Sequence, residues 1–298
     1  MRILLLSKKS SIYSTRRLVE TARQRGHAVK VVDPLKLNIA IINKKPIITY
    51  KGKSIKIPDV VIPRISGTIN SFSLSVVKQF ELLNVPVLNR SSAIALARDK
   101  FMSAQCLIAN GINVPATAMI RNPEDIDIAL NLVGGPPVIL KIIEGAQGIG
   151  VILAESRDSI ESTINAFFSL GQNIIIQQFV SESKGKDIRI LVVGNRVVAS
   201  MRRVAKAGEF RTNIHRGGQG ERIILPVLYQ DIALRAVKTM GLDLAGVDII
   251  ESSDGPKVLE INPSPGIEGL EKTSNIDIAI DIISYVEGLV NQRHQAKK

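Results

Sequence analysis

Three polar residues near the C-terminal end of the chain have the types and spacing of a divalent-metal site. Asp248 lies in one apolar run and Glu260 in the next, and Asn262 follows Glu260 by two positions. The turn sequence Ser-Asp-Gly at 253–255 lies midway between the runs, so a hairpin with a three-residue loop places Asp248 opposite Glu260. Asn262 shares the face of Glu260, because side chains two apart on a strand point the same way.

Two carboxylates that face each other across a strand pair repel unless a cation lies between them. An amide oxygen beside them completes the all-oxygen ligand set that Mg²⁺ or Mn²⁺ prefers. The alternative is that these side chains form the solvated outer face of an amphipathic hairpin, because acidic residues are mostly exposed. The hairpin alone does not decide between the two.

A lysine followed by a glycine-rich loop has the character of a phosphate site. Lys141 lies in a β-branched strand, and glycines follow at 145, 148 and 150. Glycine lets backbone N–H groups approach phosphate oxygens, and the lysine supplies a fixed cation. The loop does not end in Gly-Lys-Ser/Thr, so it is not a P-loop. The alternative is a tight β-hairpin turn, but a lysine in an otherwise buried strand favours an anion nearby.

The segment from Arg196 to Arg222 is strongly basic. Its seven basic residues are accompanied by two acids, Glu209 and Glu221; the basic residues are Arg196, Arg202, Arg203, Lys206, Arg211, Arg216 and Arg222. Arginine binds phosphates and carboxylates through two parallel hydrogen bonds, so this segment could close over a phosphoryl group and an acidic substrate. The alternative is a solvated basic loop.

The composition of the 298-residue chain sets limits on its function. Its formal charge of +12 predicts an anionic partner, but there is no tryptophan and there are few other aromatic residues, which argues against sequence-specific nucleic-acid binding. The single cysteine, Cys106, excludes an internal disulfide framework, and the three histidines are too scattered for a zinc site. No apolar run is long enough for a signal peptide or a membrane span, so we expect a cytoplasmic protein.

Hydrophobic periodicity predicts an α/β protein of two or three lobes. A strand over 2–6, a helix over 14–25 and a strand over 28–32 form an opening βαβ unit without Gly-x-Gly-x-x-Gly. A short hairpin-like stretch follows over 47–57, and the first lobe closes near residue 95. The later pattern predicts a helix over 93–110, strands over 114–120, 137–143, 173–180, 187–193 and 196–201, helices near 156–169 and 227–240, the acidic hairpin, and a last helix near 276–291.

The order of these motifs resembles that of an ATP-grasp ligase, and the closest resemblance is to the RimK-type branch. The similar stretches are Ala97–Lys100, Glu144–Gly150, Gln177–Val180, Asp187–Arg189, Phe210–Gly218, Asp248 and Glu260–Gly266. The resemblance covers essentially the whole chain except its last few residues. The resemblance implies an ATP-grasp fold with α+β lobes: an N-terminal pre-ATP-grasp domain over 1–95, an ATP-grasp domain over 96–287 with subdomains 96–176 and 177–287, and a basic tail over 288–298.

The resemblance also implies roles for individual residues. The residues implied to bind ATP are Lys100, Lys141, Gly148, Gln178, Phe179, Asp187, Arg211, Thr212 and Asn213. Asp248, Glu260 and Asn262 would hold two Mg²⁺ or Mn²⁺ ions, and Arg203 and Arg211 would act in catalysis. Arg64, Arg202, Arg216 and Ser264 would bind substrate. Relatives commonly carry glutamate at the position of Gln178, so a side-chain role there is open.

The activity implied is that of an ATP-dependent carboxylate-amine ligase. It would add L-glutamate to the acidic C-terminus of small-subunit ribosomal protein S six through a carboxyl phosphate, with a possible docking to the ribosome and with self-association into a homo-oligomer. An alternative acceptor is an amino-acid-carrier protein or a coenzyme tail. An alternative of another class is a ribosome- or RNA-binding protein with a vestigial ligase fold.

Overall fold

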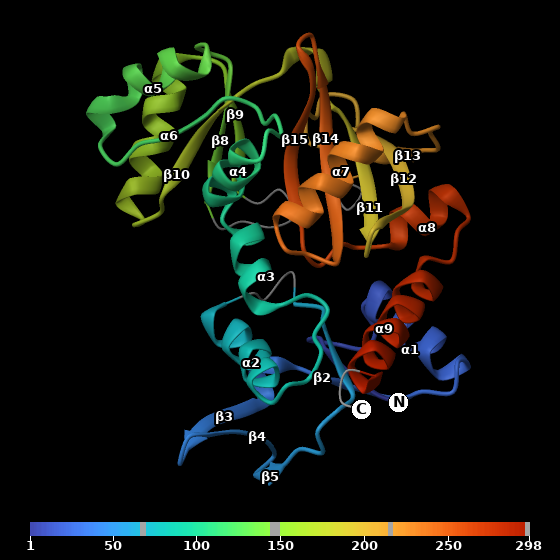
Figure 1. Cartoon of the computed structure of the whole chain (residues 1–298). Helices are drawn as coiled ribbons and strands as arrows, with labels where there is room; N and C mark the ends of the chain where they lie inside the picture. The colour runs from blue at the N-terminus through green and yellow to red at the C-terminus, as the bar shows by residue number, and fades with distance from the viewer. Residues whose placement is uncertain (66–69, 144–149, 214–216, 296–298) are drawn as a thin grey trace.

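The computed structural model describes residues 1–65, 70–143, 150–213 and 217–295. They form an N-terminal lobe, a middle subdomain and a C-terminal subdomain, and the last two stand side by side above the first in the view of Figure 1. Among the helices that these residues form, none combines the length and the apolar character needed to cross a membrane.

The N-terminal lobe contains the predicted βαβ unit. The predicted strands 2–6 and 28–32 are confirmed as β1 and β2, and both run parallel to a third strand in the order β2-β1-β6. Apolar side chains of α1 and α2 cover this sheet. The bounds are β1 (Arg2–Leu6), α1 (Tyr13–Gln24), β2 (Ala28–Val32), β6 (Val60–Pro63) and α2 (Ser71–Leu82).

An antiparallel meander is inserted between β2 and β6. The sequence predicted only a hairpin over 47–57, whereas the structure forms three strands in the order β3-β4-β5. The sequence did not predict β3, because this strand lacks a clear alternation of apolar and polar residues. Two apolar residues at its end, Ile41 and Ile42, are 71% and 54% exposed. The bounds are β3 (Leu37–Ile42), β4 (Lys45–Tyr50) and β5 (Lys53–Ser54).

The helix predicted over 93–110 is two helices, α3 (Ser91–Arg98) and α4 (Lys100–Ala109). Asp99 between them has an extended backbone, and its carboxylate accepts hydrogen bonds from the amides of Phe101 and Met102 at 3.0 and 2.8 Å. This is an N-cap, which satisfies amides that have no partner within the helix. The break places Lys100 at the first position of α4.

The middle subdomain is a four-stranded antiparallel sheet in the order β7-β10-β8-β9. Helices α5 and α6 pack on it and share a separate hydrophobic core with it. The bounds are β7 (Thr117–Met119), α5 (Ile126–Val133), β8 (Val138–Ile142), β9 (Val151–Ala154), α6 (Arg157–Ser169) and β10 (Ile174–Gln178).

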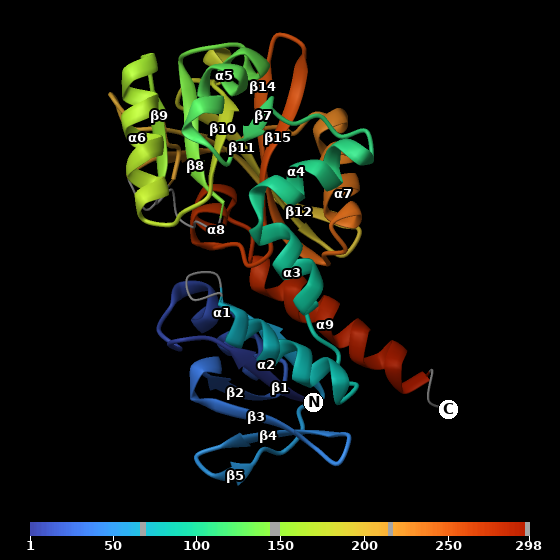
Figure 2. The ribbon, with the colours of Figure 1, turned by 90° about the vertical axis from the view of Figure 1, so that its left-hand side faces the viewer.

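The C-terminal subdomain is a five-stranded antiparallel sheet in the order β13-β12-β11-β14-β15. Helix α7 packs on one face, while α8 and α9 pack on the other, and Figures 1 and 2 show both layers. The bounds are β11 (Lys186–Val193), β12 (Arg196–Val204), β13 (Gln219–Glu221), α7 (Val227–Thr239), β14 (Leu244–Ser252), β15 (Gly255–Asn262), α8 (Glu268–Ser274) and α9 (Ile278–Gln295).

The C-terminal helix corrects the prediction of a basic tail over 288–298. Helix α9 runs to Gln295, and Val290 is buried in a core that α9 shares with β1, α1 and the C-terminal sheet. Glu287 of α9 forms ion pairs with Arg25 and His27 at 2.6 and 2.7 Å. Asn291, Gln292 and Gln295 are exposed on this helix, and residues 296–298 lie outside the described residues.

The acidic hairpin has the predicted register but reaches it by a different route. Ser252 pairs with Gly255, so the turn contains two residues rather than three. The pairing shifts between Asp248 and Ile249, because Leu259 is an extra residue in β15. The shorter turn and the bulge offset each other, and Asp248 still pairs with Glu260.

Candidate functional site

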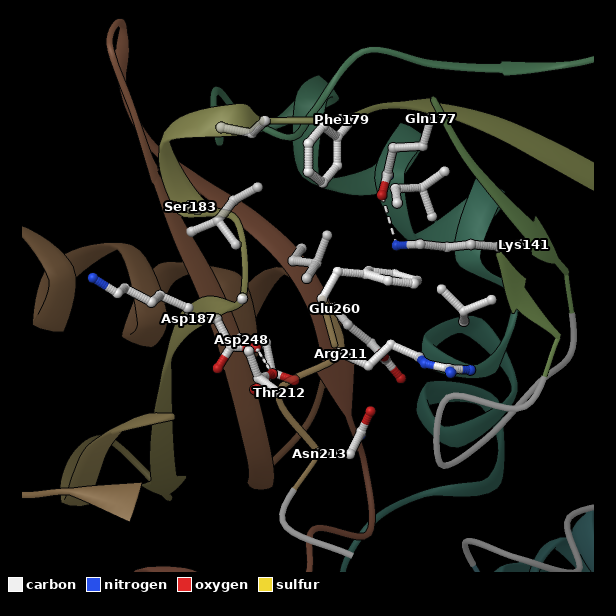
Figure 3. Close-up of a pocket in the computed structure, with 18 of the residues that line it drawn as sticks. Lys141, Gln177, Phe179, Ser183, Asp187, Arg211, Thr212, Asn213, Asp248 and Glu260 are labelled. Carbon is white, nitrogen blue, oxygen red and sulfur yellow. Dashed lines mark hydrogen bonds between the residues drawn. The ribbon is translucent and has the colours of Figure 1, made fainter. Parts of the chain in front are cut away.

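A pocket of about 920 Å³, open to solvent, lies between the middle sheet and the C-terminal sheet (Figure 3). Most of the predicted nucleotide and metal residues line it. They are Lys100, Lys141, Gln178, Phe179, Asp187, Arg203, Arg211, Thr212, Asn213, Asp248 and Glu260. Residues far apart in the chain therefore meet in one cavity.

Lys141 enters the pocket from β8, within the buried part of the middle sheet. Its ammonium donates a 2.6 Å hydrogen bond to Gln177 Oε1, and Gln177 Nε2 donates to Thr117 Oγ1 at 2.9 Å. Thr117 in turn donates to the carbonyl of Pro115, and this bond fixes which group donates and which accepts in the series of hydrogen bonds. Burial lowers the pKa of Lys141 to about 8. The buried ammonium of Lys141 is thus positioned to bind an anion, and leaving it without an anionic partner costs free energy.

The glycine-rich loop predicted to bind phosphate joins β8 to β9. Residues 144–149, which include Gly148, lie outside the described residues. The loop closes at Gly150, whose φ of +70° suits glycine and whose carbonyl accepts a 3.1 Å hydrogen bond from the Ile142 amide. Lys100 approaches the same place, because its ammonium donates to the Ile143 carbonyl at 3.2 Å.

The segment after β10 forms the upper wall of the pocket in Figure 3, where the ring of Phe179 is next to Gln177. The Gln178 amide donates a 2.8 Å hydrogen bond to the Ala116 carbonyl, and the Gln178 side chain accepts from the Ala116 amide at 3.4 Å. The side chain of Gln178 is thus directed toward the strand connection at Ala116. A glutamate oxygen at this position could accept the same hydrogen bond from the Ala116 amide.

Four charged side chains form a buried ladder across three strands of the C-terminal sheet. Arg203 donates to both oxygens of Asp187, at 2.7 and 2.6 Å, and also pairs with Asp248 at 2.7 Å. Arg189 binds both oxygens of Asp248, and the longer of these contacts is 2.6 Å. The strand register causes this arrangement, because Asp187 pairs with Arg203 and Arg189 pairs with Asp248.

The two aspartates respond differently to the same burial. Burial raises the pKa of Asp187, even though Arg203 acts in the opposite direction. Burial also acts to raise the pKa of Asp248, but Arg189 and Arg203 outweigh it and hold this pKa below its usual value. Asp248 is therefore kept ionised at the metal end of the pocket.

The proposed metal ligands fit a cation that is shared with a nucleotide. Asp248 and Glu260 face each other in register and both line the pocket, while Asn262 lies two positions beyond Glu260 on β15 and pairs with Gly246. Within the described parts of the chain, no group of three or more acidic, histidine or cysteine side chains could hold a metal. Mg²⁺ commonly uses one or two carboxylates together with substrate phosphates, and this donor set matches that pattern.

The loop after β12 supplies Arg211, Thr212 and Asn213 to the pocket. Thr212 Oγ1 donates a 2.6 Å hydrogen bond to Asp187 Oδ2, and Arg211 pairs with Glu209 at 2.8 Å. The carboxylate of Asp187 is thus occupied by Arg203 and Thr212, so in this arrangement it supports the loop, and its role in binding ribose stays a prediction. Arg216 lies outside the described residues.

The remaining predicted substrate residues are not in the pocket lining. Arg202 lies on the opposite face of β12 from Arg203, where it pairs with Glu251 at 3.3 Å beside Tyr229 of α7. Arg202 and Arg203 therefore do not share one site, because neighbouring residues of a strand point to opposite faces. Arg64 and Ser264 lie instead at the junction of the N-terminal lobe with the loop after β15.

Sequence reasoning assigned no role to two residues that organise the site, Gln177 and Arg189. A signal was available for Arg189, because it lies two positions after Asp187 and must share its face of β11. Gln177 follows three isoleucines in a buried strand, and a polar side chain in such a place indicates a polar partner across the sheet.

Two family models match the chain. A RimK-like ATP-grasp domain matches residues 97–286, and a RimK PreATP-grasp domain matches residues 1–94. The chain belongs to the RimK-like ATP-grasp family. It is 48% identical over 287 residues to a probable alpha-L-glutamate ligase of Thioalkalivibrio sulfidiphilus, covering 96% of this chain and 95% of that protein. It is 46% identical to the ribosomal protein bS6–L-glutamate ligase of Salmonella schwarzengrund, with 96% of each chain covered.

Solved structures agree on the fold. A RimK-domain ATP-grasp protein from Sphaerobacter thermophilus superposes with a TM-score of 0.75 at 23% identity, covering 96% of this chain and 99% of that one. The ATP-grasp ligase PsnB, complexed with precursor, Mg and ADP, superposes with a TM-score of 0.72 at 22% identity, covering 97% and 98%. The predicted ATP-grasp fold and the resemblance to RimK-type ligases are confirmed, and the chain is an ATP-dependent ligase.

Proposed function

We propose that this protein joins L-glutamate to the C-terminal glutamate of a ribosomal protein of the small subunit. The observation that carries the proposal is the identity of 46–49% with proteins named glutamate ligases, which extends over nearly the whole chain. The pocket supports it, because buried cations and facing carboxylates meet between the two grasping sheets. ATP is needed because a carboxylate and an ammonium do not form an amide unaided.

Binding of the nucleotide follows from the charges in the pocket. Lys141 faces the phosphates from the middle sheet and Lys100 from the start of α4, and Arg211 and Asn213 face them from the C-terminal subdomain. Asp248, Glu260 and Asn262 would hold two Mg²⁺ or Mn²⁺ ions, which would neutralise charge on the phosphate oxygens. Arg203 is fully buried between two aspartates and contributes by keeping Asp248 ionised and in place.

An acidic group of the substrate binds near Arg64, which directly follows β6. Arg64 Nη2 donates a 2.5 Å hydrogen bond to the Pro265 carbonyl. Among the described residues, the buried atoms Arg64 Nη1 and Ser264 Oγ have no hydrogen-bond partner. Burial lowers the pKa of Arg64 to about 10. A buried guanidinium with an unused donor is costly, so a carboxylate placed there is favoured.

The position of Arg64 agrees with the general rule for open parallel sheets. Ligands bind outside the carboxyl ends of the strands, at the point where the strand order reverses. In the sheet β2-β1-β6 this point lies between β1 and β6, and Arg64 follows β6 directly. The substrate thus lies between the N-terminal lobe and the C-terminal subdomain.

The reaction has two steps. An oxygen of the acceptor carboxylate attacks the γ-phosphorus, the bond to ADP breaks, and an acyl phosphate forms. The amine of glutamate then attacks the acyl carbon, phosphate leaves, and the nitrogen loses a proton. Arg211 and Lys141 stabilise the negative charge on the transferring oxygens from fixed positions, which is how proteins assist phosphoryl transfer.

ADP release with Mg²⁺ and glutamate tests the proposal. A peptide ending in Glu-Glu should support turnover, and the same peptide ending in Gln-Gln is the matched control. Turnover with an amino-acid-carrier protein or a coenzyme tail, and none with the acidic peptide, would replace the ribosomal acceptor with one of these. No ADP release with any acceptor would remove the ligase assignment in favour of a vestigial ligase fold.

The proposal includes a setting for the enzyme. It acts in the cytoplasm, where glutamate and ribosomal proteins are present, and it assembles as a homo-oligomer, as resemblance to its family suggests. Light scattering coupled to size-exclusion chromatography measures the mass in solution, and a monomer at all concentrations would contradict self-association.

A further inference from the structure

The meander β3–β5 and the residues that flank it carry an excess of positive charge. Between residues 28 and 57 there are seven lysines and one acid, Asp33; the lysines are Lys30, Lys36, Lys44, Lys45, Lys51, Lys53 and Lys56. This tenth of the chain therefore holds half of the formal net charge of +12. We call these seven residues the lysine meander.

The charge of the lysine meander is exposed and unneutralised. All seven side chains are exposed to solvent. Among the ion pairs formed by described residues, none includes one of these lysines. Two of them, Lys30 and Lys51, lie over the ring of Tyr50 with their ammonium groups 5.0 and 5.6 Å from its centroid, so both charges gather at one residue. Like charges held together without counter-charges favour an anionic partner.

The fold does not need this outer surface. Leu37 and Ile48 pack inward against the core of the N-terminal lobe, whereas Ile41 and Ile42 extend into solvent at the hairpin end. Figures 1 and 2 show the meander at the end of the molecule opposite to the sheets that form the pocket. Its lysines therefore do not bind the nucleotide or the reacting carboxylate.

We propose that the lysine meander binds the phosphate backbone of RNA. It would hold the ribonucleoprotein particle that carries the acceptor while the acidic tail reaches the pocket, so the inference rests on the proposed function. Lysine is a compact point charge suited to phosphate oxygens, and recognition of an acidic peptide would favour the paired donors of arginine, which the meander lacks. Base readout is not required, because backbone contacts alone give affinity.

Two triple variants with equal loss of charge test this proposal. The test variant replaces Lys45, Lys53 and Lys56 with glutamine. The control replaces Arg23, Arg90 and Lys238 with glutamine, which are exposed residues elsewhere on the surface. Fluorescence anisotropy with a labelled RNA duplex and with single-stranded oligouridine measures binding at low and at moderate salt.

The expected result is selective. The test variant should bind RNA at least about tenfold more weakly, with a salt slope smaller by about 2 to 3, because each phosphate contact contributes nearly one unit. The control should resemble the unmodified protein. ADP release with the free acidic peptide should be unchanged in both variants, since neither set lies in the pocket.

Three results would overturn the proposal: no RNA binding by the unmodified protein, equal weakening in both variants, or tighter binding to polyglutamate or to phosphatidylglycerol vesicles than to RNA. Failure of the proposed function has a different signature. In that case the acidic peptide supports no ADP release, while the loss of RNA binding in the test variant is still observed.

Discussion

Lys141 and Gln177 form a directed pair: the buried ammonium donates to Gln177 Oε1 at 2.6 Å, and Thr117 holds the other end of the amide. This orientation presents the amide oxygen to the lysine and leaves the remaining ammonium hydrogens for phosphate. The middle sheet thus prepares the phosphate site before a nucleotide enters.

The first prediction is that kcat/KM for ATP falls as the pH rises above about 8. Burial lowers the pKa of Lys141 to that value, so the free enzyme loses the phosphate-binding charge at alkaline pH. The direction of this pH dependence follows because a lysine is positively charged below its pKa and neutral above it. The decrease should be roughly tenfold per pH unit. In a Lys141→Arg variant the decrease should vanish, and an unchanged profile would contradict the assignment.

The second prediction concerns the amide partner. Gln177→Leu removes an acceptor from a buried cation, so the pKa of Lys141 should fall further and KM for ATP should rise roughly tenfold. Gln177→Glu should move the alkaline limit of the profile to higher pH, because a carboxylate retains the proton. Gln172→Leu, at an exposed position of the same subdomain, is the control. If both Gln177 variants keep the original alkaline limit, the pair has no influence on binding.

The third prediction concerns the metal end. Glu260→Gln should lower kcat by about 100-fold or more, because the transferring charge loses metal stabilisation, while thermal unfolding stays unchanged. Glu251→Gln lies on the same hairpin but pairs with Arg202 outside the pocket, so its activity should be near normal. Near-normal turnover of Glu260→Gln would contradict a metal-bridging role.

The fourth prediction concerns the buried ladder. Arg189→Leu should lower the free energy of unfolding by about 3–5 kcal/mol, because Asp248 keeps its charge and loses a partner that binds both its oxygens. Chemical denaturation measures this change. The double variant with Asp248→Asn should recover part of the loss. Breaking the exposed pair Arg157–Asp127 by Arg157→Leu should have no measurable effect, and equal effects at both sites would refute the comparison.

The fifth prediction concerns the end of α9. Val290→Ala should lower the free energy of unfolding by about 1.5 kcal/mol, because two methyl groups leave the shared core. Asn291→Ala, at the exposed neighbouring position, should change it little. If thermal melting shows no difference between the variants, the helix end does not contribute to stability.

Sequence patterns predicted much of the fold because strand and helix periods are local properties. The βαβ opening and the facing of Asp248 and Glu260 needed only alternation and a turn. The bulge at Leu259 was hidden, because a longer turn without a bulge gives the same pairing. The break at Asp99 had a visible signal, since aspartate is a favoured N-cap residue.

Which residues belong to the site was easier to predict than the interactions between their side chains. That Arg203 is occupied by Asp187 and Asp248 depends on the register of β12 against β11, which no single segment specifies. The same holds for Arg202, whose direction away from the pocket follows from strand alternation only once the direction of Arg203 is known. The surroundings of Arg64 depend on a contact with Pro265, which lies 201 positions later in the sequence.

The distribution of hydrophobic cores determines which part of the molecule can move. One core joins β1 and α1 to α9 and the C-terminal sheet, so the N-terminal lobe and the C-terminal subdomain form one body. The middle subdomain has a core of its own and meets that body across the pocket. We expect amide hydrogens of the middle subdomain to exchange faster than those of α9, and nucleotide to slow them selectively. The N-terminal lobe and the C-terminal subdomain would then stay fixed, and the middle subdomain, which carries Lys141, would be the part that moves to close the pocket.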